Sequence, residues 1–199
     1  MATEIRGAGG TATARVTDVT RMDEVEGLIE FAAGEYGPVD HLVNNAGLMV
    51  FSKWSDRAVD DWDKMIDTNL RGYLHAISAV LPGMIARRSG HILNLGAVAG
   101  TRVGGASGVY GATKFFIRGI TDSLHQEVGV THGIQVSMIS PGVIDTGWAR
   151  RSPTPRASRS PRTSTRARST PPASPSTTSS STPPARTGEP ARPWKRSTS

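Results

Sequence analysis

The chain has 199 residues, no cysteine and a formal net charge of +6. The lack of cysteine excludes a disulfide framework and thiolate chemistry, and it favours a cytoplasmic protein. No run of about 18 apolar residues occurs, so the sequence predicts no membrane span.

The charge is divided unevenly along the chain. Residues 1–148 carry a net charge of −4, whereas residues 149–199 carry +10 and contain no Leu, Ile, Val, Phe, Met or Tyr. Such a segment buries too little apolar surface to offset its ordering entropy, so we expect a disordered, basic Ser/Thr/Pro/Arg-rich tail over 149–199. Nucleic-acid binding through this tail stays an alternative, but a solvated tail is favoured because aromatic residues that stack bases are not interleaved with its cations.

The N-terminal residues predict the end of a helix over 1–6, a glycine turn over 7–10 and a strand over Thr11–Val19. Gly7, Gly9 and Ala12 formally match the G-x-G-x-x-A nucleotide-binding fingerprint. We reject that interpretation because the fingerprint needs a preceding strand and a following helix, and β-branched residues follow here.

Helical and extended patterns then alternate. The periodicity predicts helices over 21–36, 56–88 and 108–128, with short apolar strands over 41–43, 91–95 and 134–139. This alternation indicates an α/β fold with a parallel sheet, in which ligands bind beyond the carboxyl ends of the strands. Asn45, Ala97 and Pro141 each follow a predicted strand and should therefore share that edge.

Tyr110 and Lys114 are four residues apart, a spacing that places both side chains on one face of a helix. A neighbouring ammonium favours the phenolate, so we expect Lys114 to lower the pKa of Tyr110 and make it a usable general acid or base. Taken alone, such a pair is more often a surface neighbour pair.

Four motifs together resemble the short-chain dehydrogenase/reductase family. They are Asn44-Asn45-Ala46-Gly47, Thr68-Asn69-Leu70, Tyr110-x-x-x-Lys114 and the stretch from Pro141 to Thr146, which occur in the family's order and spacing. The resemblance covers residues 4–148. It implies a partial Rossmann-type, doubly wound parallel sheet over 1–148, NAD or NADP as cofactor, and hydride transfer between the nicotinamide and a small alcohol or carbonyl substrate.

The resemblance also implies a role for each matching residue. The catalytic residues would be Asn69, which holds a water linked to Lys114, Tyr110, which moves the substrate proton, and Lys114, which also holds the nicotinamide ribose. Asp18 and Val19 would face the adenine. The cofactor would further contact Asn45, Ala46, Gly47, Pro141, Gly142, Ile144 and Thr146.

Departures from the family pattern imply impaired activity. Ala97 stands thirteen positions before Tyr110, where the family has a catalytic serine. The first strand, its glycine-rich loop and the second strand of the family have no counterpart, and a tail replaces the last helix and strand. In strand order 3-2-1-4-5-6, Thr11–Val19 is then not adjacent to the strand over 41–43, so we expect it to lack a partner or to move inward.

Several alternatives stay open. A non-catalytic remnant, or pseudo-enzyme, would share the same motifs, and helices 58–88 and 108–128 could mediate a homo-oligomer as in the family. No metal site is expected, because His75, His91, His125 and His132 have no partners at ligand spacing in the sequence.

Overall fold

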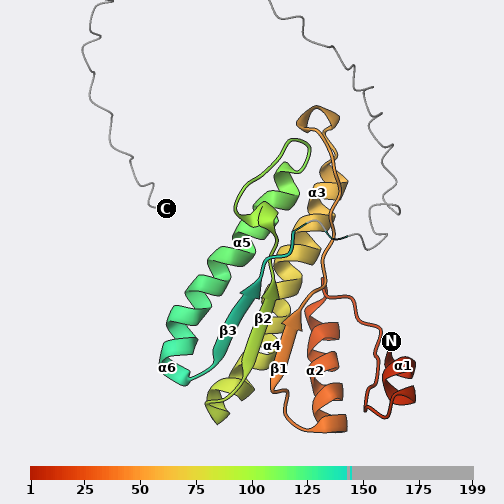
Figure 1. Ribbon diagram of the computed structural model, residues 1–199, viewed down its shortest axis with the longest axis vertical. Coiled ribbons are helices and arrows are strands. Elements are labelled where there is room, and N and C mark those ends of the chain that lie inside the picture. The colour runs from red at the N-terminus through yellow and green to blue at the C-terminus, as the bar shows by residue number, and fades with distance from the viewer. Residues whose placement is uncertain (143, 145–199) are drawn as a thin grey trace, which may run out of the picture. The chain divides into compact units, whose positions relative to one another are not determined.

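The computed structural model describes residues 1–142 and 144. All of them belong to the first of two compact units, Met1–Arg156, and the predicted tail over 149–199 lies outside the described residues. Figure 1 shows this first unit as an α/β arrangement in which helices alternate with strands.

The elements follow the predicted order closely. In chain order they are α1 Ala2–Gly7, α2 Met22–Tyr36, β1 His41–Asn44, a 3-10 turn Trp54–Asp56, α3 Val59–Ile66, a π-helical turn Asp67–Arg71, α4 Gly72–Arg87, β2 His91–Leu95, a 3-10 turn Val98–Gly100, α5 Gly108–Leu124, a π-helical turn His125–Gly129, α6 Val130–His132 and β3 Gln135–Ile139. The three predicted strands after residue 40 are confirmed, as are the predicted helical regions. Among the described helices, none is long and apolar enough to cross a membrane.

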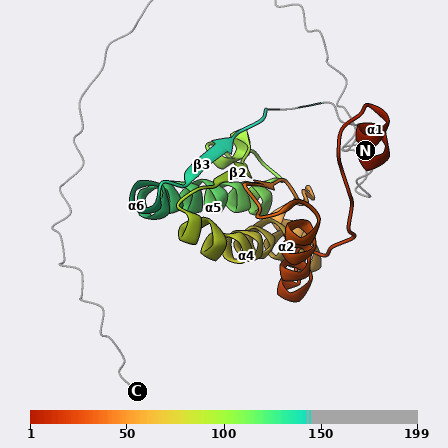
Figure 2. The ribbon, with the colours of Figure 1, turned by 90° about the horizontal axis from the view of Figure 1, so that it is seen from below.

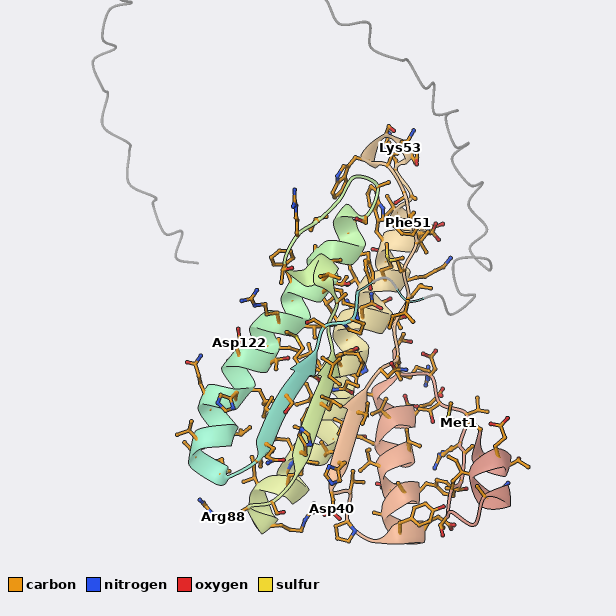
Figure 3. All side chains as sticks on the ribbon, viewed as in Figure 1. Met1, Asp40, Phe51, Lys53, Arg88 and Asp122 are labelled. Atoms are coloured by element: carbon orange, nitrogen blue, oxygen red, sulfur yellow. The ribbon has the colours of Figure 1, made fainter. Side chains whose placement is uncertain are left out.

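The sheet is parallel with strand order β1-β2-β3, which confirms the predicted α/β class. Helices α4 and α5 connect successive strands and cover one face of the sheet together with α2 (Figure 2). The three strands run in the same direction, so Asp40 and Arg88 lie near their amino ends, and Phe51 and Lys53 lie beyond their carboxyl ends (Figure 3).

The core lies between the helices and the covered face of the sheet. Its cluster of buried residues is formed by Ile77, Val80, Met84, Ile92, Val128 and Ile134, against which Leu42 of β1 and Val136 of β3 pack. Because side chains alternate along a strand, Leu42, Ile92 and Val136 face the helices, whereas His41 and His91 project from the opposite face.

The predicted strand over Thr11–Val19 is wrong. These residues form no strand, and Val16 is fully exposed. A strand is stable only when its backbone groups pair with a neighbour, and β-branched composition alone does not supply one. The sheet partners expected for this segment in the 3-2-1-4-5-6 order are not among the described strands, so the segment is without a partner, one of the two predicted outcomes.

The predicted helix over 56–88 is interrupted at the functional motif. Its α-helical parts, α3 and α4, are joined by the π-helical turn Asp67–Arg71, which contains Asn69. A π-helical turn inserts an extra residue into the helix and is common at functional sites. Here it accompanies a fully buried Asn69 side chain.

Candidate active site at the carboxyl ends of the strands

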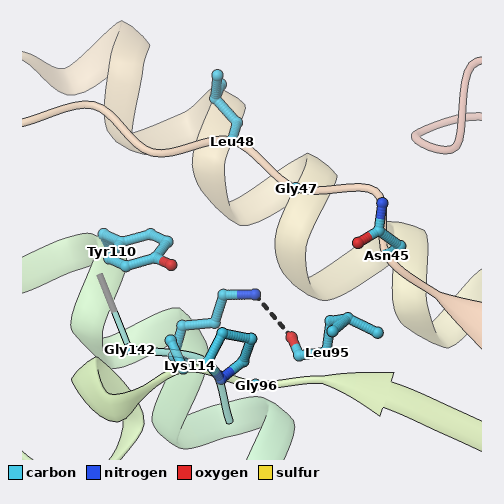
Figure 4. Close-up of a pocket in the computed structure, with 10 residues that line it drawn as sticks. Asn45, Gly47, Leu48, Leu95, Gly96, Tyr110, Lys114 and Gly142 are labelled. Carbon is cyan, nitrogen blue, oxygen red and sulfur yellow. Dashed lines mark hydrogen bonds between the residues drawn. The ribbon is translucent and has the colours of Figure 1, made fainter. Parts of the chain in front are cut away.

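A pocket opens where the three strands end. Its lining residues come from the loops after β1, β2 and β3, from the end of β2 and from α5. They are Asn45, Gly47, Leu48, Leu95, Gly96, Ala97, Tyr110, Lys114, Pro141 and Gly142. Figure 4 shows Tyr110 and Lys114 pointing into this pocket from the same helix. The predicted edge therefore brings together Asn45, Ala97 and Pro141 as expected.

Lys114 is held by a strand end. Its side chain is 6% exposed, and its Nζ donates a 2.8 Å hydrogen bond to the carbonyl oxygen of Leu95, the last residue of β2. The hydroxyl of Tyr73, on α4, donates to the same oxygen at 3.0 Å. The Nζ atom also lies 5.7 Å from the ring centre of Tyr73 and 5.8 Å from that of Tyr110. The ammonium thus lies within about 6 Å of the centres of two aromatic rings at the pocket wall.

Burial dominates the proton affinities of both predicted catalytic groups. Desolvation lowers the pKa of Lys114 to about 8, and it raises the pKa of Tyr110 above its usual value of 10.0. The expectation that Lys114 lowers the pKa of Tyr110 is therefore wrong for this structure. The physical reason is that burial penalises the phenolate, while the Lys114 ammonium is directed at the carbonyl of Leu95.

Asn69 lies beneath the pocket and connects two of its walls. Its Oδ1 accepts a 2.7 Å hydrogen bond from the backbone N–H of Leu48, and its Nδ2 donates to the Leu48 carbonyl oxygen at 2.8 Å. The same Nδ2 donates to Thr113 Oγ1 at 3.0 Å, and that hydroxyl donates to the carbonyl oxygen of Tyr110 at 2.7 Å. Through these bonds the Asn69 side chain fixes the loop after β1 against the helix that carries Tyr110.

The predicted adenine contacts do not line the pocket. Asp18 is exposed, and its carboxylate accepts hydrogen bonds from the backbone and hydroxyl of Thr20, which lower the pKa of Asp18. Val19 packs close to Gly72 at the start of α4, and its carbonyl oxygen lies 3.0 Å from His75 Nδ1.

The other predicted cofactor contacts divide into three groups. Gly47, Pro141 and Gly142 line the pocket with Asn45, whereas Ala46 lies next to the lining but is not part of it. Ile144 is 63% exposed and is not a lining residue. Thr146 lies outside the described residues.

Sequence reasoning missed Leu48, Leu95 and Gly96 in the pocket, and Tyr73 and Thr113 behind it. Leu48 and Leu95 contribute through backbone groups, for which side-chain patterns give no signal. Gly96 could have been suspected from its position after a strand: a Cβ atom there would lie 2.9 Å from Met138 Sδ and 3.0 Å from Ser140 Oγ, so a larger residue would require these side chains to shift.

In open parallel α/β sheets, ligands bind in the crevice beyond the carboxyl ends of the strands, which is where Tyr110 and Lys114 converge. The family profile described as short chain dehydrogenase matches residues 1–156. The chain belongs to the short-chain dehydrogenase/reductase family, which confirms the resemblance drawn from its motifs.

Individual proteins agree with this assignment. An uncharacterized oxidoreductase of Staphylococcus saprophyticus is 47% identical over 131 residues, which cover 65% of this chain and 53% of the relative. A gluconate 5-dehydrogenase from Burkholderia cenocepacia, solved with NADP and tartrate, matches with a TM-score of 0.71 and 31% identity, covering 75% of this chain and 58% of that one. An NAD⁺-bound xylitol dehydrogenase matches with a TM-score of 0.70 and 30% identity, covering 74% and 57%. The chain thus spans little more than half the length of these proteins.

Proposed function

We propose that this chain binds NAD or NADP at the pocket and acts as an oxidoreductase on a small alcohol or carbonyl substrate. The observation that carries the proposal is the convergence of Tyr110 and Lys114 on the pocket formed by Asn45, Gly47 and Pro141. The similar gluconate 5-dehydrogenase and xylitol dehydrogenase are solved with NADP and NAD⁺ respectively.

The residues present fit the nicotinamide–ribose half of such a cofactor. An ammonium has three N–H donors, and the hydrogen bond to Leu95 uses one of them, which leaves two for ribose hydroxyls. Gly47 and Gly142 present backbone at the pocket wall, where a flat ring can approach. Described residues 7–12 do not supply a pyrophosphate cradle, because they follow helix α1 and precede a segment without regular structure.

The proposed proton transfer uses this chain's own groups. When bound, the cofactor would supply the hydride-transfer chemistry at its nicotinamide ring. The Tyr110 hydroxyl would donate a proton to the carbonyl oxygen of the substrate during reduction, or accept it during alcohol oxidation. Lys114, whose pKa is about 8, would hold the ribose hydroxyls with its remaining N–H groups. Asn69 would act by holding Leu48 and Thr113 in place.

The test separates binding from turnover. Titration of the full chain with NADPH and with NADH, followed by cofactor fluorescence, should show saturable binding that Lys114→Met weakens. Tyr110→Phe should retain binding but abolish alcohol-dependent formation of NADPH or NADH, whereas Tyr36→Phe, on an exposed surface of α2, should change neither. No saturable binding of either cofactor would overturn the proposal. Binding without turnover in the parent chain would identify a non-catalytic member of the family.

Self-association through α4 and α5 also stays a proposal. Leu74 on α4 and Phe115 on α5 are 44% and 45% exposed, which is consistent with an apolar contact between copies. The alternative of nucleic-acid binding rests on the basic tail, which lies outside the described residues.

A further inference from the structure

Two histidines far apart in the sequence meet on the sheet. His41 is the first residue of β1 and His91 the first residue of β2, and the parallel register pairs them directly. In a strand, residues at paired positions project from the same face, so both imidazoles lie on the face opposite the helices. Their ring centres are 5.6 Å apart, with the planes inclined at 74°.

This separation matches the geometry of two imidazoles on one metal ion. With a zinc–nitrogen bond of about 2.1 Å, each ring centre lies about 3.2 Å from the metal, and ligand angles of about 110–120° separate the two centres by about 5.2–5.5 Å. The observed 5.6 Å lies next to that range, so the ring separation is compatible with both imidazoles binding one ion. The parallel pairing of β1 with β2 fixes the backbone spacing of the two residues.

A third side chain orients one of the rings. His91 Nε2 lies 3.0 Å from Ser137 Oγ, on β3. Metal-bound histidines usually have a hydrogen-bond partner on the ring nitrogen that does not bind the metal, and this partner fixes the ring orientation. Ser137 can serve as that partner, which leaves Nδ1 of His91 as the ligand atom.

Access and ligand number agree with a surface site. His41 is exposed and His91 is half-buried, so an ion with water ligands can reach both rings. In the described part of the chain, no group of three or more His, Cys, Asp and Glu side chains could hold a metal ion. The pair would therefore supply two protein ligands, and water would complete the coordination shell.

We propose that His41 and His91 form a two-imidazole binding site for a divalent transition metal ion, Zn²⁺ or Cu²⁺, on the face of the sheet opposite α4 and α5. Imidazole nitrogen suits both ions, and Cu²⁺ binds nitrogen ligands more tightly than Zn²⁺ does. A bound ion would link β1 to β2 near their amino ends, away from the pocket at their carboxyl ends. The proposal is thus independent of the oxidoreductase assignment.

The experiment titrates the full, untagged chain with Zn²⁺ by calorimetry and records the electron paramagnetic resonance spectrum of the Cu²⁺ complex. We expect one ion per chain, with two nitrogen ligands in the Cu²⁺ spectrum. Loss of an outer-shell partner weakens metal binding by about 10–100-fold, so loss of a ligand in His41→Gln or His91→Gln should weaken it by at least about tenfold. Ser137→Ala should cause a smaller loss.

His125→Gln is the matched control, because it removes an exposed imidazole elsewhere in the chain. It should leave Zn²⁺ affinity unchanged. His41→Gln is the decisive variant, since an exposed side chain can be replaced with little risk to folding, which circular dichroism would verify. Unchanged Zn²⁺ affinity in folded His41→Gln, or a Cu²⁺ spectrum without nitrogen ligands in the parent chain, would overturn the proposal.

Discussion

The Nζ atom of Lys114 donates a hydrogen bond of 2.8 Å to the carbonyl oxygen of Leu95. This bond joins the helix that carries Tyr110 to the end of the central strand β2, and it holds a nearly buried ammonium at the pocket. The position of Lys114 therefore depends on the strand order as much as on the helix. The cost of its burial appears in its lowered pKa.

Stability should change with pH because of Lys114. The pKa of Lys114 is about 8 in the folded chain, and its reference value of 10.5 stands for the unfolded chain. At a pH between these two values, the unfolded chain therefore binds more protons than the folded chain. The free energy of unfolding should then rise as pH increases from about 8 towards 10, and the full shift corresponds to about 3 kcal/mol. Above pH 10 the sign reverses, because burial raises the pKa of Tyr73 and Tyr110. Urea unfolding at pH 7, 8, 9 and 10 measures the rise, and Lys114→Met should remove it.

Restoring a hydroxyl at position 97 should raise turnover. Ala97 lines the pocket with Tyr110, and a serine there could donate a hydrogen bond to the substrate oxygen. Loss of one such donor in related sites costs about 10²–10³ in kcat, so Ala97→Ser should increase turnover by up to about a hundredfold. Ala99→Ser, outside the pocket lining, is the control. Equal turnover in the parent and Ala97→Ser would show that the hydroxyl has no partner there.

Asn69 should contribute to stability as well as to the site. Asn69→Ala would remove the partners of the Leu48 N–H and carbonyl groups and one partner of Thr113. Buried groups left without partners cost about 1–3 kcal/mol each, and with partial relaxation we expect a loss of about 2–3 kcal/mol. Asn45→Ala, at an exposed position, should change stability by less than about 0.5 kcal/mol. Urea midpoints compare the two variants, and similar midpoints would contradict the role given to Asn69.

Two glycines, Gly100 packed against α5 and Gly119 inside it, should respond in opposite directions. A Cβ atom at Gly100 would lie 2.7 Å from the carbonyl oxygen of Lys114, so Gly100→Ala must displace backbone, at a cost of about 1–3 kcal/mol. Nothing lies within 4 Å of the Cβ position of Gly119, inside α5. Gly119→Ala should therefore stabilise the chain by about 0.5–1 kcal/mol. Thermal melts of both variants test this, and a destabilised Gly119→Ala would contradict it.

The regular elements after residue 20 could be predicted because their signals are local. The helix over 108–128 and the strand over 91–95 follow from the spacing of apolar residues within each segment. The strand expected over Thr11–Val19 was wrong because a strand also needs a pairing partner. The composition of this segment favours extended backbone, but the local sequence does not specify a neighbouring strand.

In the functional site, too, some features follow from local spacing and others depend on contacts between distant residues. The four-residue spacing of Tyr110 and Lys114 was enough to predict that they share a helix face, and the motifs after each strand were enough to place Asn45 and Pro141 at one edge. The direction of the Tyr110 pKa was not predictable, because it depends on burial by residues distant in the chain. Nor were the contacts of Asn69 with Leu48 and Thr113, which cross from one element to another.

The sequence by itself determined the order of helices and strands after residue 20, the family, and which side chains share a helical face, because these follow from local periodicity and motif spacing. Only the tertiary structure decided which strand pairs with which, how deeply Lys114 is buried and that His41 lies beside His91. Those facts depend on contacts between residues far apart in the chain. Such contacts are set by backbone pairing and desolvation, about which the spacing of residues along the sequence carries no information.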